Sequence, residues 1–284
     1  MEVLDREELL VQAQELDPLP ATVTRLASLV ADPNSNMEDI VEAISLDSAL
    51  TVKLLRVANS AASGAASEIT TVDQAVMRVG TGSVLSMAVA AGVRARMVAE
   101  LPAYGFEEGE LWQHSVAAAL AAESLRGLVP VDLPPESFTA ALLHDVGKLV
   151  LCRYLGAQLA ELVRRSHPDE PGPTFLDERS LLEIDHGELG AIVAEHWKLP
   201  TSIVAGIRHH HDPDGAPGAD TGASVPSIVH LADLVAHRLV GKGQEPPDDE
   251  FTPGLTRLGM DAMGLENLLY RTQLRLDQVG ERFS

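Results

Sequence analysis

Residues 141–148 read Ala-Leu-Leu-His-Asp-Val-Gly-Lys and place His144 and Asp145 side by side in an apolar run. The run predicts a helix, and a buried histidine or carboxylate is costly unless it pairs or holds a metal ion. Neighbouring helical residues point about 100° apart, so both side chains reach one centre only if it lies between their directions. With Lys148 close by, the stretch is a candidate site for a metal ion and a phosphate.

The composition of the chain favours helices. Of its 284 residues, 45% are hydrophobic but only 4% are aromatic, and Ala and Leu predominate, which suits helices better than strands. The run around His144 is predicted to be one helix from Glu136 to about Leu155. No segment alternates between polar and apolar residues as a half-buried strand does. The sequence therefore predicts an all-α protein.

Pro and Gly residues between Leu101 and Gly109 mark a boundary between two groups of helices. Residues 1–100 are predicted to form an N-terminal helical bundle, packed on a second helical bundle in residues 101–240. Residues 241–284 would then contain an acidic linker, residues 241–252, and a final amphipathic helix from Leu265 to Arg282. That helix either folds back on the core, the commoner outcome, or forms the contact of a homodimer.

The charge of the chain limits its partners. A formal net charge of -21 opposes direct binding to nucleic acid or to an anionic membrane surface. A small anionic ligand would need a local positive centre, such as a metal ion. Cys152 is the only cysteine, which excludes an intrachain disulfide and favours a reducing compartment. The first residues lack the pattern of a signal peptide, so we expect a cytoplasmic protein.

All ten histidines lie beyond residue 109, and acidic residues accompany several of them. Glu110 and His114 are spaced to share one helix face, although a solvated pair at a helix start is the plainer interpretation. His144 and Asp145 alone would be a hydrogen-bonded core pair about as often as a pair of ligands. Asp233 lies in an otherwise apolar segment, where an unpaired carboxylate would be expensive.

The remaining histidines have plain alternatives as well. His186 follows Asp185 at a predicted helix start, where a histidine is usually a surface residue. His209, His210 and His211 end a helix, where the dipole favours cations. Taken together, however, the imidazole and carboxylate groups suit Zn, Mn or Fe rather than Ca. Two such ions can activate a water molecule and bind a phosphate, and the charge of Lys148 could assist.

The order of these residues resembles that of the HD superfamily of metal-dependent phosphohydrolases. Residues Leu143 to Lys148 match the central motif of that superfamily, and the wider set is similar to the HD-GYP subgroup, which hydrolyses cyclic dinucleotides at a two- or three-metal centre. The subgroup continues from a histidine pair as HHExxDGxGYP. Aligned on His209 and His210, this chain has His211 in place of the Glu and Pro217-Gly-Ala219 in place of Gly-Tyr-Pro.

The N-terminal half resembles the HDOD family, the HD-related output domains. Residues Ile44 to Ser60, which include Asp47-Ser-Ala-Leu50 and Ala58-Asn-Ser60, look like the hallmark of that family. Residues 71–80 fit its pattern, as do Gly187-Glu-Leu-Gly190 and Trp197-Lys-Leu-Pro200. A capped amphipathic helix alone would explain the first segment, but the motifs occur in the family's order over roughly residues 16–240.

The resemblance implies a fold and a function. The C-terminal bundle would be HD-domain-like, and the protein would be an output module of bacterial signalling that acts through a protein partner or a small anionic, nucleotide-like ligand. Many such domains have lost their metal ligands, whereas this chain keeps a nearly complete set for one or two divalent transition metal ions. The implied ligands are Glu110, His114, His144, Asp145, His186, His209, His210 and Asp233.

The retained set leaves open an alternative, an active metal-dependent phosphohydrolase similar to a cyclic-dinucleotide phosphodiesterase. In that case Asp145 would bridge two metal ions and orient the attacking hydroxide, and Lys148 would assist phosphate binding. A third reading is a metal ion that holds helices together without turnover.

Overall fold

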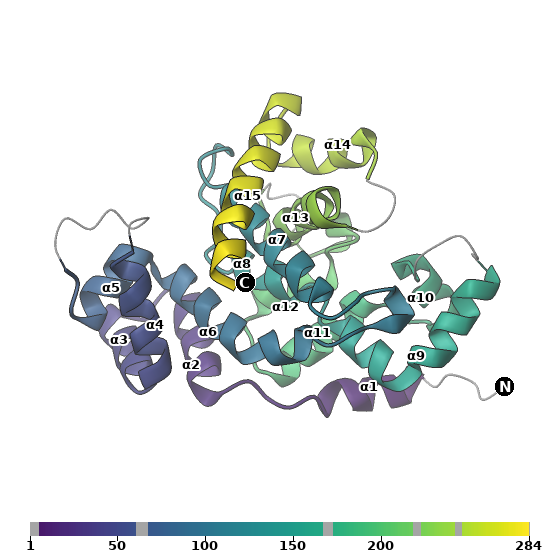
Figure 1. The fold of residues 1–284 in the computed structure, drawn as a ribbon, viewed down its shortest axis with the longest axis horizontal. Coiled ribbons are helices and arrows are strands. Elements are labelled where there is room, and N and C mark those ends of the chain that lie inside the picture. The colour runs from purple at the N-terminus through teal and green to yellow at the C-terminus, as the bar shows by residue number, and fades with distance from the viewer. Residues whose placement is uncertain (1–5, 61–67, 167–172, 218–222, 242–245, 284) are drawn as a thin grey trace.

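The computed structural model describes residues 6–60, 68–166, 173–217, 223–241 and 246–283. Almost all of its regular structure is helical (Figure 1), and in the described ranges the only β-type pairing is a single bridge between Leu101 and Phe106. The all-α prediction is therefore confirmed. The described part of the chain contains no single helix with the length and apolarity to cross a membrane, although the bent pair α5–α6 meets both criteria jointly.

The N-terminal helices α2 to α5 gather at one end of the molecule (Figure 1). Two of these helices begin at capping residues. The side chains of Asn36 and Asp47 accept hydrogen bonds from backbone N–H groups in the first turns of α3 and α4. Helix α6 then leads from this bundle to the rest of the molecule and packs on α8 as well as α2. The bounds are α2 Ala21–Ala31, α3 Met37–Ser45, α4 Ser48–Ala58, α5 Val72–Val79 and α6 Thr81–Met97.

Helix α1 (Arg6–Gln14) lies away from that bundle, against α9 and α11 (Figure 1). Arg6 pairs with Glu188 of α11 at 2.9 Å. The indole N–H of Trp197 donates to the carbonyl oxygen of Asp17 at 3.0 Å, just after α1. The chain from α1 to α2 therefore runs from the C-terminal group of helices to the N-terminal bundle. The predicted domain division at residue 100 stays a prediction.

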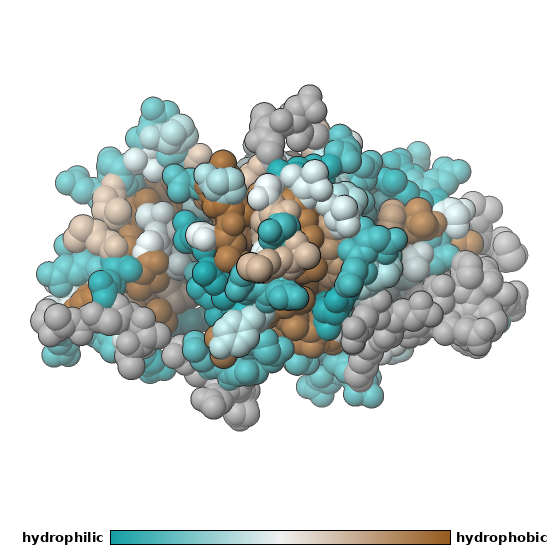
Figure 2. All heavy atoms as spheres, turned by 90° about the horizontal axis from the view of Figure 1, so that it is seen from above, coloured by the Kyte–Doolittle hydropathy of each residue, from teal (hydrophilic) through white to brown (hydrophobic). Residues whose placement is uncertain are grey.

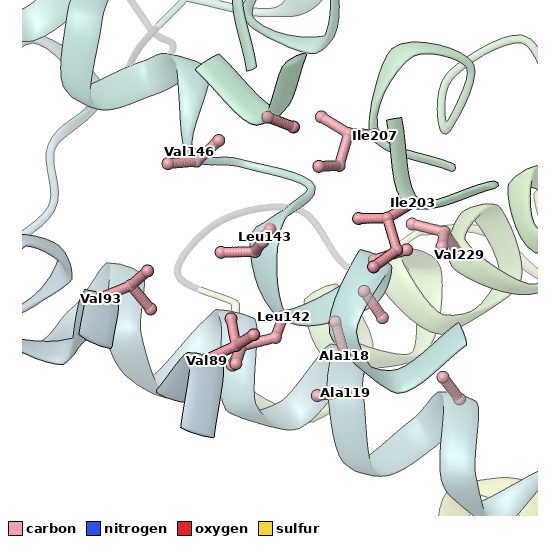
Figure 3. Packing of buried hydrophobic residues seen from close by; sticks show 14 of the residues in the cluster. Val89, Val93, Ala118, Ala119, Leu142, Leu143, Val146, Ile203, Ile207 and Val229 are labelled. Carbon is pink, nitrogen blue, oxygen red and sulfur yellow. The ribbon is translucent and has the colours of Figure 1, made fainter. Parts of the chain in front are cut away.

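The remaining helices pack around another part of the same hydrophobic core, which is continuous through the described residues. Helix α13 packs against α7, α8 and α12, and Leu142 and Leu143 of α8 lie among side chains such as Val89, Ile203 and Val229 (Figure 3). The bounds are η2 Pro102–Tyr104, α7 Glu110–Ser124, α8 Ser137–Leu143, α9 Gly147–Ser166, α10 Phe175–Leu182, α11 His186–His196, α12 Thr201–Arg208, η3 Pro213–Gly215 and α13 Val225–Val240.

The helix predicted from Glu136 to Leu155 is broken after His144, and this corrects the prediction. Helix α8 ends at Leu143 and α9 begins at Gly147. The break follows from close packing, because a Cβ atom at Gly147 would lie 1.9 Å from the carbonyl oxygen of His186. The chain turns at Asp145 to bring a bare backbone against the start of α11.

The C-terminal region is more regular than the sequence predicted. Helix α14 (Asp248–Arg257) begins within the predicted linker at residues 241–252 and takes up its last five residues. Helix α15 (Ala262–Phe283) folds back on α7, where Leu268 is fully buried and Arg275 pairs with Glu123 at 2.7 Å. Folding back, the first of the two predicted alternatives, is therefore observed.

On the face seen in Figure 2, hydrophobic residues gather near the middle of the molecule among hydrophilic ones.

Candidate metal centre

Asp145 occupies the turn between α8 and α9 and is almost completely buried. Its Oδ2 atom lies 2.8 Å from the Lys148 ammonium and 3.3 Å from Nε2 of His144. Its Oδ1 atom lies 3.2 Å from Nε2 of His186. The two carboxylate oxygens therefore face two different groups of side chains.

The first group is formed by His114, His144 and Asp233, which come from α7, the end of α8 and α13. His114 Nε2 lies 3.0 Å from Asp233 Oδ1 and 3.3 Å from His144 Nε2. His144 Nε2 is also 3.3 Å from Asp233 Oδ1. All three residues are buried, so this group brings three ligand atoms to one point inside the core.

The second group is formed by His186, His210 and His211. His186 opens α11, where the side chain of Asp185 caps the helix by accepting from Glu188 N–H. Its Nε2 atom lies 3.3 Å from Nε2 of His210 and 2.9 Å from Nε2 of His211. The ring of His211 stacks on Phe175, with centroids 4.2 Å apart. This group lies on the Oδ1 side of Asp145.

The orientation of the imidazoles fits a metal ion. Nδ1 of His144 lies 2.7 Å from the Ala141 carbonyl oxygen, and Nδ1 of His210 lies 2.6 Å from that of Ile207. A carbonyl oxygen only accepts, so each Nδ1 carries hydrogen and each Nε2 keeps its lone pair free in the neutral ring. Nε2 atoms face one another at 3.3 Å in the first group and at 2.9 and 3.3 Å in the second, a spacing that a shared proton or a bound cation would stabilise.

In the first group, the pKa values of the two histidines shift in opposite directions. Burial, together with nearby His237, lowers the pKa of His114 to about 4. Burial also opposes protonation of His144, but the carboxylates of Asp145 and Asp233 outweigh it and raise its pKa to about 10. The two carboxylates thus favour positive charge at His144.

The second group likewise contains histidines whose pKa values shift in opposite directions. Burial opposes protonation of His186, but the Glu178 carboxylate raises its pKa to about 9. Burial and nearby imidazoles hold the pKa of His210 and of His211 well below the usual value for histidine. Carboxylates thus favour positive charge in both groups, and donors of nitrogen and carboxylate oxygen suit Zn, Mn or Fe.

Five of the eight predicted ligands lie in these two groups, and Asp145 joins one histidine of each in a third group, His144, Asp145 and His210; the five are His114, His144, His186, His210 and Asp233. Glu110 and His209 do not belong to any metal-binding group found among the described residues. The carboxylate of Glu110 instead accepts from Glu107 N–H at 2.7 Å, at the start of α7. Whether any of these residues binds metal stays a prediction.

The histidine pair is displaced by one residue from the predicted one. His209 ends α12 as its C-cap, and the turn that follows directs His210 and His211 inward. The alignment with the HD-GYP subgroup placed His211 at the position of a Glu, so His211 was not predicted to be a ligand. Of the loop motif Pro217-Gly-Ala219, only Pro217 is among the described residues.

Lys148 and Asp145 were the two residues predicted to be catalytic. Lys148 is buried, and its ammonium forms an ion pair with Asp145 Oδ2. Its ammonium also lies 5.6 Å from the ring centre of Tyr104 and 5.7 Å from that of Phe106.

Three residues near the two groups were not predicted from the sequence. Glu178 and Tyr104 support His186, and His237 Nε2 lies 3.5 Å from Asp233 Oδ1. The i, i+4 spacing of Asp233 and His237 was the one available signal.

Comparison with known proteins identifies the family. The family model of the HDOD domain matches residues 16–213 of this chain. The chain belongs to the HDOD family. An uncharacterized protein of Treponema pallidum (strain Nichols) is 28% identical to this HDOD protein over 204 residues, which are 72% of this chain and 39% of the relative. The chain thus matches well under half of that relative's length.

Solved structures share the fold of this HDOD protein. An HDOD domain protein from Geobacter sulfurreducens has a TM-score of 0.70 at 23% identity, over 96% of this chain and 98% of that one. A candidate signal transduction protein from Marinobacter aquaeolei VT8 has 0.68 at 25%, over 95% and 59%. A candidate phosphohydrolase from Shewanella amazonensis SB2B has 0.62 at 26%, over 94% and 97%. Solved proteins named for signalling and for hydrolysis thus have folds similar to that of this chain.

Proposed function

We propose that this HDOD protein is a signalling output module built around a two-ion metal centre. One observation carries the proposal: Asp145 presents one oxygen to each of two buried groups of ligand atoms. The similarity to a candidate signal transduction protein supports the signalling role. The module acts by binding a protein partner or a small anionic, nucleotide-like ligand.

The residues that would hold the ions follow from the two groups. His114, His144 and Asp233 would hold the first ion, and His186, His210 and His211 would hold the second, with Asp145 between them. Bound ions of this kind supply positive charge that polarises a phosphate and activates a water molecule. Lys148 neutralises Asp145, and His237, whose side chain is 42% exposed, lies at the solvent edge of the first group.

The proposed docking surface for a protein partner is the N-terminal bundle. Large hydrophobic side chains are exposed there on or beside three helices: Leu46 follows α3, Val52 lies on α4 and Met77 lies on α5. The metal centre lies in the other group of helices. Partner binding and metal binding would thus use separate parts of the chain.

A second candidate function is metal-dependent phosphohydrolysis. The nearly complete ligand set and the position of Lys148 beside Asp145 favour it, as does the similarity to a candidate phosphohydrolase. The burial of the Lys148 ammonium against Asp145 weighs against it, since this charge already has a partner. Regulation therefore ranks first.

A turnover assay separates the two functions. Wild type and His144→Ala, each loaded with Mn²⁺, would be incubated with a cyclic dinucleotide and with a simple phosphodiester. The regulatory proposal predicts equal, background hydrolysis by both proteins. Hydrolysis by wild type that His144→Ala abolishes would contradict it as a complete account and would establish the second candidate.

A further inference from the structure

A fully buried carboxylate, Glu178 of α10, lies directly behind the second group. Its Oε2 atom accepts from the backbone N–H of His186 at 2.6 Å and lies 2.8 Å from Nδ1 of the same residue. Its Oε1 atom lies 3.0 Å from that Nδ1. Glu178 therefore contacts the side of the imidazole that faces away from His210 and His211.

Tyr104 holds this carboxylate from the opposite side. Its hydroxyl donates to Glu178 Oε1 at 2.6 Å, and the residue is buried in η2, on the segment that joins α6 to α7. With its backbone and side-chain partners, Glu178 accepts from three donors on two distant parts of the chain. Its position is consequently fixed, and it cannot turn away from His186 without leaving buried donors unsatisfied.

Helix α10 is built to present Glu178. Thr174 and Asp177 form a reciprocal capping box at the start of the helix. The helix ends two turns later at Glu183, which has a positive φ of 55°. This short helix places Glu178 in the core only eight residues before His186.

The chemical effect of such a contact is general. A carboxylate that accepts from Nδ1–H keeps the hydrogen on that nitrogen, directs Nε2 toward the opposite side and makes Nε2 a stronger donor to a metal ion. In this protein the opposite side is the space shared with His210, His211 and Oδ1 of Asp145. The first group has no contact with Glu178 among the described hydrogen bonds and ion pairs.

We propose that Glu178 is the positioning residue of the second ion, and that Tyr104 secures it from the segment between the two groups of helices. This inference rests on the proposed metal centre. Neutralising Glu178 weakens binding at the second position by about 10–100-fold and leaves the first position unchanged. Loss of the Tyr104 hydroxyl acts in the same direction with a smaller effect, because Glu178 keeps its contacts with His186.

The test is calorimetric titration of the metal-free, full-length protein with Mn²⁺. Wild type is compared with Glu178→Gln, Tyr104→Phe and the control Asp177→Asn, which perturbs the start of α10 but not the contact with His186. Circular dichroism of each protein checks that its helix content matches wild type. We expect two binding events in wild type, a selective 10–100-fold loss at one of them in Glu178→Gln, a smaller loss in Tyr104→Phe and none in Asp177→Asn.

Two other outcomes have distinct meanings. A folded Glu178→Gln protein that binds Mn²⁺ as wild type does, or that loses both events equally, overturns the positioning role and leaves the metal centre intact. Wild type that binds no Mn²⁺ overturns the proposed centre and the inference together.

Discussion

At the scale of single residues, the direction of each imidazole decides what the site can bind. His144 and His210 are held by backbone carbonyl oxygens three residues earlier, and His186 is held by Glu178. These contacts leave the Nε2 atoms converging on the two sides of Asp145. A site of this kind depends on the exact residue at each turn, so a shift by one position along the chain removes a ligand.

The pair His209 and His211 tests this dependence. His211→Ala removes a member of the second group, so we expect elemental analysis to find about one ion per chain instead of two. His209→Ala removes a side chain outside both groups and should retain the metal content of wild type. Loss of metal in His209→Ala with full content in His211→Ala would show that the family alignment, and not the structure, had the correct pair.

At the residue scale, the cost of burial indicated from the sequence which polar residues need partners. Asp233 in an apolar helix and His144-Asp145 in an apolar run are too costly to bury without partners, and the structure supplies those partners. The choice between His209 and His211 could not be made in the same way. It depends on the path of the chain after α12 ends at Arg208, and the local sequence of three histidines does not specify that path.

At the scale of elements, the break between α8 and α9 shapes the site. Hydrophobic periodicity runs through it and predicted one helix, because both helices bury apolar side chains next to the break. The turn is set by a contact with α11, which is more than 35 residues away in sequence. Helix α14 was missed for a related reason: its acidic first turn and Pro253 are typical of a linker, whereas Phe251 is fully buried.

Two glycines of α9 provide a matched test of the break. Gly147→Ala places a Cβ atom 1.9 Å from the His186 carbonyl oxygen, and we expect overpacking to lower the free energy of unfolding by about 1–3 kcal/mol or more. Gly156→Ala meets no atom within 4 Å and should raise that free energy by about 0.5–1 kcal/mol, since alanine favours a helix. Denaturant unfolding measures both. Equal effects of the two substitutions would contradict the close approach of α9 and α11.

At the scale of the whole molecule, the two groups draw residues from α7, the α8–α9 turn, α11, the end of α12 and α13. The sequence specified the helical class and the order of motifs, since both are local properties. It did not specify that α1 lies against α9 and α11, because that contact depends on tertiary packing such as the bond from Trp197 to Asp17. Metal ions at the centre would link most helices of the C-terminal half.

Metal binding should therefore stabilise the fold as a whole. A ligand that binds only the folded state adds about 2.7 kcal/mol at a free concentration of about 100 Kd. We expect the Tm of metal-loaded protein to fall when a chelator is added and to recover when Mn²⁺ is restored. His144→Ala, which lacks a ligand of the first group, should show a smaller change. A chelator that leaves the Tm of wild type unaltered would count against a metal shared between helices.

Anomalous diffraction from crystals of Mn²⁺-loaded protein would show whether Asp145 lies between two metal ions. We expect two anomalous peaks, both next to Asp145: one among His114, His144 and Asp233 and one among His186, His210 and His211. Crystals of fully loaded protein with no peak at these residues, or with metal only elsewhere on the molecule, would contradict this expectation.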